Sequence, residues 1–592
     1  MLISVRARRL RLSIALILGL LIPALSVPAI GQRAPRQNPG AVAGKSPRAK
    51  PVATTAQSAT NRMAADSAVA APALPSFVGS KEPGWLYKGS DITPDPKWSF
   101  GTLPNGVRYA VRRNGVPPGQ VSVRVRIDAG SLFETDTERG FAHLIEHLSF
   151  RGSAYVPDGE AKRVWQRMGT TFGSDTNAQT TPTETVYKLD LPSATESGLD
   201  ESLKILAGMM EKPNITSVAL NAERPVVLAE QREQPGAQVR FGDAVRQAFY
   251  AGQPLADRSP IGNIKTLEAA TAESVRAFHD RWYRPERVVV ILSGDVDPVV
   301  MERLIQKNFV GWKGVGAPPA EPDLGAPDPA QPVAHISVEP TIPTIVTFSV
   351  LRPWQYRDDT VIFNQKRLVD LVALRVINRR LESRARAGGS YLQANVGLDD
   401  VARSANATTV DIIPVGDDWQ SALRDVRAVI ADASAAAPSQ AEIDRELSEF
   451  DAAMKNDVDT SAAEAGAKQA DDLVQALDIR ETVTSAETAY QILQDARSKG
   501  MFNPTAMLES TRRVLTGVAS RALVNLHAPD TAVEGKLAAA LTADVSGLAS
   551  KRLQQRTVDF SKLPPLGKPG EVASRGVIGG FGTEKIVFNN GV

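Results

Sequence analysis

The sequence predicts a mixed α and β protein with two folded domains, and three observations support this. Its 592 residues exceed the roughly 250 to 300 that one hydrophobic core serves. Segments with the apolar alternation of strands are interspersed with segments of helical spacing. A run rich in proline, glycine and alanine at 314–332 separates the two parts. We therefore expect one domain at 85–313, a linker at 314–332 and a second domain at 333–548.

Composition excludes several classes of function. Lysine and arginine number 68 against 66 aspartate and glutamate, so no excess of positive charge indicates a nucleic-acid partner. The chain has no cysteine, which removes disulfides, thiolate metal ligands and cysteine nucleophiles. Neither a GxSxG motif nor a GxxxxGK[ST] phosphate loop is present. Any metal must therefore be held by histidine and carboxylate groups.

The first 31 residues read as a signal peptide. Four arginines between positions 6 and 11 precede an apolar run from Leu12, and the small residues Ala29 and Gly31 follow it. An uncleaved membrane anchor is the alternative, because the apolar run approaches spanning length. Residues 32–84 have few large apolar side chains and are expected to be a disordered linker. We expect a periplasmic or secreted protein without stable membrane association after cleavage.

The first domain should begin with strands. Asn105-Gly106 lies between two apolar stretches and predicts a hairpin. Residues 121–128 alternate valine and isoleucine with polar residues, which predicts a strand with one buried face. Thr135 to Glu138 resembles a capping box and should open the next helix. Further helices are expected at 160–168, 198–211 and 219–234, and further strands at 184–191 and 287–294.

The second domain repeats this mixture. Strands are expected near 344–350 and 407–413, and long amphipathic helices at Asp359–Arg386 and around 440–478. Residues 549–592 contain a loose Pro/Gly-rich stretch and end in KIVFNNGV, which is similar to TLPNGV near the start of the first domain. We expect this ending to be the start of a further half that the 592 residues lack.

The strongest functional signal is HLIEH at 143–147. On a helix, His143 and His147 point the same way, so both imidazoles can reach one metal ion. Glu146 lies beside them and can accept a proton from a metal-activated water without being a ligand. This HxxEH order is that of the inverzincin metallopeptidases.

The chain around this motif resembles the pitrilysin and insulinase family of zinc metallopeptidases, most closely the long bacterial forms that fuse two halves. The resemblance covers about 95–545 and is carried by RIDAGSLFE, GFAHLIEHLSFRGS, GTTFGSDTNAQTTPTETVYKLDLP, AERPVVLAEQRE, RSPIG and FHDRWYRPERVVVILSGDVD. It implies an α+β fold of two similar domains, each a mixed, mainly antiparallel sheet with helices on one face. It also implies one Zn²⁺ per chain, peptide substrates, and a second peptidase half in the same or a partner chain.

The resemblance implies Glu230 as the third zinc ligand, from the segment ERPVVLAE. The spacing from His147 alone favours Glu223, whereas the matching letters favour Glu230. The extra residues fit in the GSDTNA loop and the region 195–218. The two glutamates lie seven residues apart on one helical face, which suits a ligand and a residue that supports a ligand. Pro225 disfavours helical geometry at Arg224 and is expected to put Glu223 at the start of the helix.

The resemblance also implies that Asn177 and Ala178 offer backbone groups to an extended substrate, which would add a strand at this edge. An ordinary polar loop is the competing interpretation. Arg258 in RSPIG is expected to support the domain without a role in the reaction. His279, His335 and His527 have no second ligand at metal spacing and should be surface or packed residues.

The predicted function is that of a zinc-dependent endopeptidase that hydrolyses peptides or unfolded polypeptides. In this prediction zinc on His143, His147 and Glu230 activates a water, and Glu146 is the general base. The alternative is a non-catalytic subunit that binds peptides, or a scaffold that zinc only stabilises.

Overall fold

The computed structural model describes residues 89–233, 236–549, 570–578 and 583–590. By its contacts the chain divides into a large unit that ends at Ser550 and a small unit of residues 551–592. The expected signal peptide at 1–31 and linker at 32–84 lie outside the described residues. Within the described ranges, no helix has the length and apolar character needed to cross a membrane.

The first part of the large unit is built on a six-stranded sheet of order β1-β2-β6-β3-β5-β4. All neighbours are antiparallel except β2 and β6, which are parallel. The hairpin expected at Asn105-Gly106 is present between β1 and β2. The strands are β1 (Ser99–Thr102), β2 (Arg108–Arg113), β3 (Val121–Ile127), β4 (Thr176–Thr180), β5 (Thr185–Leu191) and β6 (Val288–Gly294).

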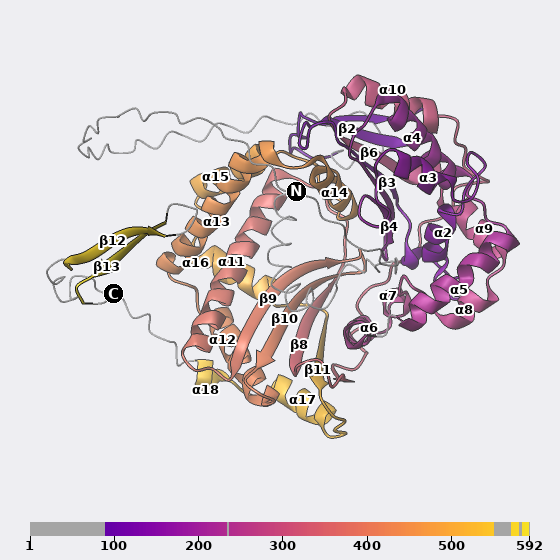
Figure 1. The fold of residues 1–592 in the computed structure, drawn as a ribbon. Helices are drawn as coiled ribbons and strands as arrows, with labels where there is room; N and C mark the ends of the chain where they lie inside the picture. The colour runs from indigo at the N-terminus through magenta and orange to yellow at the C-terminus, as the bar shows by residue number, and fades with distance from the viewer. Residues whose placement is uncertain (1–88, 234–235, 550–569, 579–582, 591–592) are drawn as a thin grey trace, which may run out of the picture. The chain divides into compact units, whose positions relative to one another are not determined.

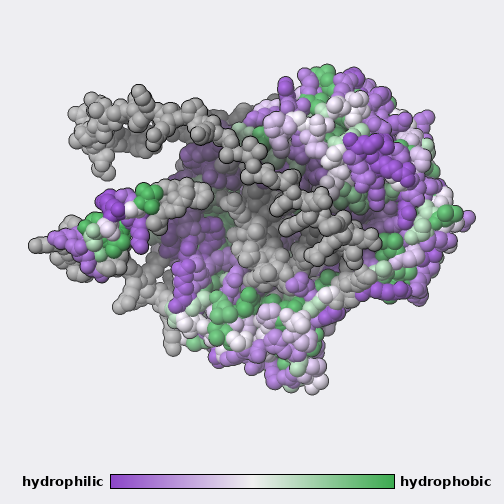
Figure 2. All heavy atoms as spheres, viewed as in Figure 1, coloured by the Kyte–Doolittle hydropathy of each residue, from purple (hydrophilic) through white to green (hydrophobic). Residues whose placement is uncertain are grey.

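Helices cover one face of this first sheet, with α3, α4 and α10 beside its central strands in Figure 1. Apolar residues of β3, β5 and β6 and of these helices form the largest core cluster. On the face shown in Figure 2, hydrophilic side chains predominate over these helices. The helices are α2 (Phe141–Ser149), α3 (Glu160–Arg167), α4 (Glu196–Glu211), α5 (Ser217–Glu233), α6 (Ala237–Phe249), α7 (Pro254–Asp257), α8 (Ile264–Ala269), α9 (Ala272–Trp282) and α10 (Pro298–Phe309).

The second part of the unit is built on a five-stranded sheet of order β7-β11-β8-β10-β9. Its neighbours are antiparallel except β7 and β11. Both sheets are thus mixed and mainly antiparallel, which confirms the predicted α+β fold class. The strands are β7 (Ala334–Val338), β8 (Ile345–Pro353), β9 (Tyr391–Val401), β10 (Ala405–Pro414) and β11 (Ala519–Leu526).

The long helix expected at Asp359–Arg386 is present as α11, and α11 and α12 lie along one side of this sheet in Figure 1. The helical segment expected around 440–478 is broken into α13 and α14 by a short 3-10 turn at Ser461–Ala463. The helices of this part are α11 (Val361–Arg386), α12 (Trp419–Ala435), α13 (Gln440–Thr460), α14 (Gly466–Asp478), α15 (Ala486–Ser498), α16 (Pro504–Val514), α17 (Val533–Thr542) and α18 (Ser546–Ala549).

The break before α14 allows this helix to pack on the first sheet, on the face opposite α4 and α10 (Figure 1). Gly466 lies so close to Ser293 that a Cβ would meet its carbonyl oxygen at 2.7 Å. Leu473 and Leu477 pack against Val289 and Ile291 of β6. Burial of each leucine contributes roughly 1.5 to 3 kcal/mol. Contacts across α14 therefore join the two sheets into one unit.

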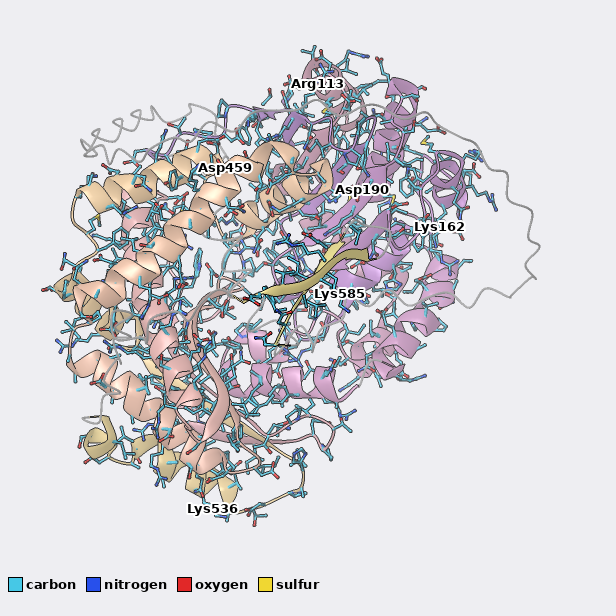
Figure 3. All side chains as sticks on the ribbon, turned by 60° about the vertical axis from the view of Figure 1, so that its left-hand side comes forward. Arg113, Lys162, Asp190, Asp459, Lys536 and Lys585 are labelled. Carbon is cyan, nitrogen blue, oxygen red and sulfur yellow. The ribbon has the colours of Figure 1, made fainter. Side chains whose placement is uncertain are left out.

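The prediction that β3 has one buried face is wrong, because all seven of its residues are buried. Its apolar face points into the main core, and α14 covers the other face. Arg124 bonds Asp190 and Asp471 there, both at 2.8 Å; Asp190, on β5, is labelled in Figure 3. The Asp471 carboxylate comes from a helix 347 residues away in the chain, and together with Asp190 it makes burial of the Arg124 guanidinium possible.

A second group of charges lies where β3 ends. Asp128 accepts hydrogen bonds from Arg126, Arg403 and Arg480 at 3.1, 3.2 and 3.1 Å. Although burial opposes it, these guanidiniums hold the pKa of Asp128 well below its usual range. Arg403 and Arg480 have positive φ angles of 55° and 61°, a conformation that costs free energy in a residue with a side chain. Both strained residues come from the second part of the unit.

The small unit is described as a two-stranded antiparallel sheet of β12 (Val572–Ile578) and β13 (Thr583–Phe588). In KIVFNNGV, the residues up to Phe588 belong to β13 and pair with β12. The pairing satisfies the backbone groups on one side of each strand.

Candidate metal centre

Two helices of the first part bring the predicted site residues together. Helix α2 carries His143, Glu146 and His147, and helix α5 packs against it and carries Glu223 and Glu230. One ligand atom from each of His143, His147 and Glu230 lies within 4.8 Å of the others. These three form the one such group of histidine and carboxylate side chains in the described residues.

The ring nitrogens converge on the Glu230 carboxylate. Its Oε2 lies 3.3 Å from His147 Nε2 and 3.9 Å from His143 Nε2. The two imidazole centroids are 4.7 Å apart, with an angle of 77° between the ring planes. Both histidines are thus oriented with Nε2 toward a common point beside one carboxylate oxygen.

Glu223 orients the second histidine. Its Oε1 lies 3.0 Å from His147 Nδ1, and its Oε2 accepts a hydrogen bond from Arg151 Nε at 2.5 Å. Burial opposes ionisation of Glu223, but its bonds to His147 and Arg151 lower its pKa. An ionised acceptor at Nδ1 fixes the proton on that nitrogen, which leaves Nε2 free to bind a metal.

The two histidines have opposite electrostatic environments. Burial and the neighbouring His147 lower the pKa of His143 to about 4. Burial acts in the same direction on His147, but hydrogen bonds to Glu223 and Glu230 raise the pKa of His147 to about 9. Two imidazoles this close cannot both be in the cationic, doubly protonated form without strong repulsion.

Glu146 lies on the same helix but takes no part in the three-residue cluster. Its side chain is buried, and burial raises its pKa to about 7. Thr180 opposes this rise, because its hydroxyl donates to Glu146 Oε2 at 2.6 Å. A carboxyl group with a pKa near neutrality is suited to exchange protons.

The start of α2 differs from the prediction. The bond from Thr135 N to Glu138 Oε2 is present at 3.0 Å, but the helix begins only at Phe141, after Gly140 with φ 97°. The buried Glu134 carboxylate instead accepts the N–H groups of Gly140 and Ala142, both at 2.9 Å. A residue outside the helix therefore satisfies its first donors and fixes its direction.

The expected effect of Pro225 is also wrong. Helix α5 is continuous through this proline, and Glu223 lies inside the helix instead of at its start. Helical geometry at Arg224 is supported by a contact outside the helix, because its guanidinium donates to Ala270 O. Glu223 and Glu230 consequently face α2 two turns apart.

The donor set fits zinc. Two imidazole nitrogens and one carboxylate, with a carboxylate behind one imidazole, match the ligands and supports of three-residue zinc sites. The second nitrogen of His143, Nδ1, is buried and has no hydrogen-bond partner among the described residues. The site could therefore hold one Zn²⁺ through His143, His147 and Glu230.

Two family models match the chain in succession. Residues 110–259 match the model described as Insulinase (Peptidase family M16), and residues 269–449 match the Peptidase M16 inactive domain. The chain belongs to the pitrilysin and insulinase family. The active-domain match includes α2 and α5, whereas the inactive-domain match runs through the linker into α13.

Relatives in this family are named as zinc proteases. The "Probable zinc protease PqqL" of Escherichia coli (strain K12) is 34% identical over 227 residues, which is 38% of this chain and 24% of that protein. The chloroplastic stromal processing peptidase of Pisum sativum is 30% identical over 213 residues, 36% of this chain and 16% of that protein. The matched region spans about a quarter of the length of the PqqL proteins or less.

The fold is shared with solved members of the insulinase family. The first half of the periplasmic protease PqqL from Escherichia coli aligns with a TM-score of 0.70 and 23% identity, over 79% of this chain and all of that one. The structure of the periplasmic protease PqqL itself aligns with a TM-score of 0.71, over 84% of this chain and 55% of that chain.

The remaining predicted residues lie apart from the cluster or at its edge. Asn177 and Ala178 are on the edge strand β4, which packs against α2. Arg258 donates to Glu134 O at 3.0 Å and to Asp136 Oδ1 at 2.9 Å, so it supports the loop before α2. His279 bonds Met210 O inside the core, and His335 and His527 bond the carbonyls of Pro332 and Pro340.

Sequence analysis missed three side chains near the site, namely Thr180, Arg151 and Glu134. Thr180 and Arg151 both lie inside the segments that carry the family resemblance, but neither residue type indicates chemistry alone. Glu134 carried a weak signal, since it precedes the capping pattern by one residue. Only packing shows that its carboxylate reaches the helix start.

Proposed function

We propose that this protein is a zinc-dependent endopeptidase that hydrolyses peptides or unfolded polypeptides. The observation that carries the proposal is the convergence of His143, His147 and Glu230 within 4.8 Å, beside a buried carboxyl group at Glu146. When bound at these residues, zinc would polarise the scissile carbonyl and lower the pKa of the attacking water.

The side chains of this protein would then divide the remaining work. Glu146 would take the proton from the attacking water and pass it to the leaving amine, since its pKa lies near neutrality. Glu223 would keep the His147 ring in the tautomer that binds metal, through the 3.0 Å contact to Nδ1. Arg151 would hold Glu223 in place.

The substrate would bind as an added strand along β4. This strand is the edge of its sheet and packs against α2, so a peptide paired with it would pass close to Glu146. Backbone pairing recognises extended chains without demanding a sequence, which suits unfolded polypeptides. Asn177 and Ala178 are the proposed contacts.

We also propose that the active enzyme has a second peptidase half, in the same or a partner chain, and acts in the periplasm. The support is the alignment with the first half of PqqL, a periplasmic protease of Escherichia coli, together with the sequence pattern of residues 1–31. The second half would close over the site and exclude bulk water.

The test uses two variants of α2 with a quenched peptide substrate and metal analysis. Glu146→Gln should lower kcat by at least ~100-fold while zinc content stays at one per chain. His147→Ala should lose both zinc and activity. Equal loss of zinc in both variants would refute the role of Glu146, and a zinc-loaded wild type without hydrolysis would indicate a scaffold.

A further inference from the structure

The free edge of β4 lies beside α2. The strand pairs with β5 on one side only. Just after the strand, Thr181 N donates to Glu184 O at 2.8 Å, toward the β5 side. Because successive N–H groups of a strand point in opposite directions, those of Ala178 and Thr180 point to the free edge.

One outward N–H, that of Ala178, donates to Asn177 Oδ1 at 2.9 Å, from the preceding side chain. Thr180 instead makes a contact with α2 through its side chain. The first contact is local, whereas the second joins the edge strand to the proposed general base, Glu146.

The hydroxyl of Thr180 donates to Glu146 Oε2 at 2.6 Å, a distance typical of a hydrogen bond between a hydroxyl and a carboxylate. One residue of the edge strand thus holds the Glu146 side chain. A threonine at a strand edge ordinarily faces solvent, whereas this hydroxyl bonds a buried carboxyl group 34 residues away.

We infer that Thr180 is a positioning residue that fixes the Glu146 carboxylate to the strand along which the peptide binds. This inference rests on the proposed function. A peptide paired with β4 has its scissile bond at a set place along the strand. Thr180 fixes the position of the Glu146 carboxylate relative to the same strand, and hence relative to the scissile bond. Misplacement by about 1 Å can cost on the order of 100-fold in rate, so a fixed carboxylate should raise kcat.

The expected signature separates positioning from folding and from substrate binding. Thr180→Val keeps the shape of the side chain but removes the hydroxyl. It should lower kcat about tenfold, a part of the total contribution of a general base, with KM changed less than about threefold and one zinc retained. Thr180→Ser keeps the donor and should restore kcat to within about threefold of the wild type.

The matched control is Thr102→Val at the opposite edge of the same sheet. Thr102 lies on β1, and its buried hydroxyl has no hydrogen-bond partner in the described parts of the chain. The same substitution there should leave kcat, KM and zinc content unchanged. It measures what loss of a strand threonine does when no contact to Glu146 is involved.

The experiment compares the four proteins as complete zinc-loaded enzymes, by steady-state kinetics, metal analysis and crystal structures. A structure of Thr180→Val should show the Glu146 carboxylate displaced or in more than one rotamer. Unchanged kcat in Thr180→Val, a rise in KM alone, or an equal loss in Thr180→Ser would overturn the inference. A wild type that binds zinc and hydrolyses nothing would refute the proposed function, and this inference with it.

Discussion

In the two sheets of the large unit, an edge strand beside a helix has two different roles. In each, an edge strand packs against a helix, β4 against α2 and β9 against α11. On α11, the Asn378 amide donates to Val396 O at 3.0 Å and accepts from Val396 N at 2.7 Å. On α2, Glu146 accepts a hydrogen bond from the Thr180 hydroxyl at 2.6 Å.

The difference between an amide and a carboxylate explains the two outcomes. An amide satisfies an N–H and a C=O together, so Asn378 closes the edge of β9 at Val396. An ionised carboxylate can only accept, so Glu146 satisfies a donor of β4 and retains the capacity to bind a proton. The first contact stabilises the fold, and the second holds a titratable group beside two histidines.

The largest expected effect concerns the assignment of the carboxylate ligand in the first part. Glu230→Gln should weaken zinc binding by more than ~100-fold, beyond the 10- to 100-fold that loss of a supporting residue such as Glu223 costs. Competition with a chelator measures both affinities. If Glu223→Gln releases the metal and Glu230→Gln retains it, the ligand is Glu223, and the short distances from Glu230 to the histidine Nε2 atoms do not identify the ligand.

The junction between the parts can be broken at Asp128. Asp128→Asn removes the carboxylate that three guanidiniums share, two of which, Arg126 and Arg403, are buried. Loss of one partner from a buried ion pair costs about 3 to 5 kcal/mol. The thermal midpoint of the large unit should fall by several degrees. Asp459→Asn is the control: Asp459, labelled in Figure 3, forms an exposed bond to Lys455 and should change stability little. Similar midpoints for both variants would show that the junction does not depend on Asp128.

The comparison of the edge strands predicts a purely structural effect at Asn378. Asn378→Ala leaves two backbone groups of Val396 without their bonds, which costs about 1 to 3 kcal/mol. Zinc affinity and cleavage of a short peptide should not change. Asn221→Ala is the control, because Asn221 is exposed and its amide oxygen accepts a hydrogen bond from Arg224 of the same helix at 3.2 Å. Loss of zinc on Asn378→Ala would contradict the division of roles between the two strands.

The last predicted effect is a change of stability with pH that originates in the second sheet. Burial raises the pKa of Asp411 from 3.8 to about 6, although a bond from Thr347 opposes this. The folded state therefore binds this proton more tightly than the unfolded state, so stability falls as pH rises from about 4 through about 6. Asp411→Asn should remove this loss, so its advantage in the free energy of unfolding should grow between pH 4 and 7, to at most about 3 kcal/mol, which thermal unfolding at each pH measures. A difference that does not vary with pH would show that Asp411 titrates normally.

The sequence by itself determined the local elements and the ligand motif. The spacing of His143 and His147 on a helix, the hairpin at Asn105-Gly106 and the long helix ending at Arg386 depend on residues near one another in the chain. Such features follow from periodicity and turn chemistry, which one segment carries alone. The α+β class followed from the family resemblance on the same segments.

The tertiary structure decided whatever depends on partners far along the chain. Arg124 looked like a solvent-facing strand residue until α14 supplied Asp471, and Thr180 looked like an ordinary loop threonine until α2 placed Glu146 beside it. Pro225 looked like a helix breaker, but a contact of Arg224 with Ala270 supports a continuous α5. In each case the free energy of a long-range contact outweighs a local preference of about 1 to 3 kcal/mol. The sequence pattern of one segment gives no information about a partner far along the chain.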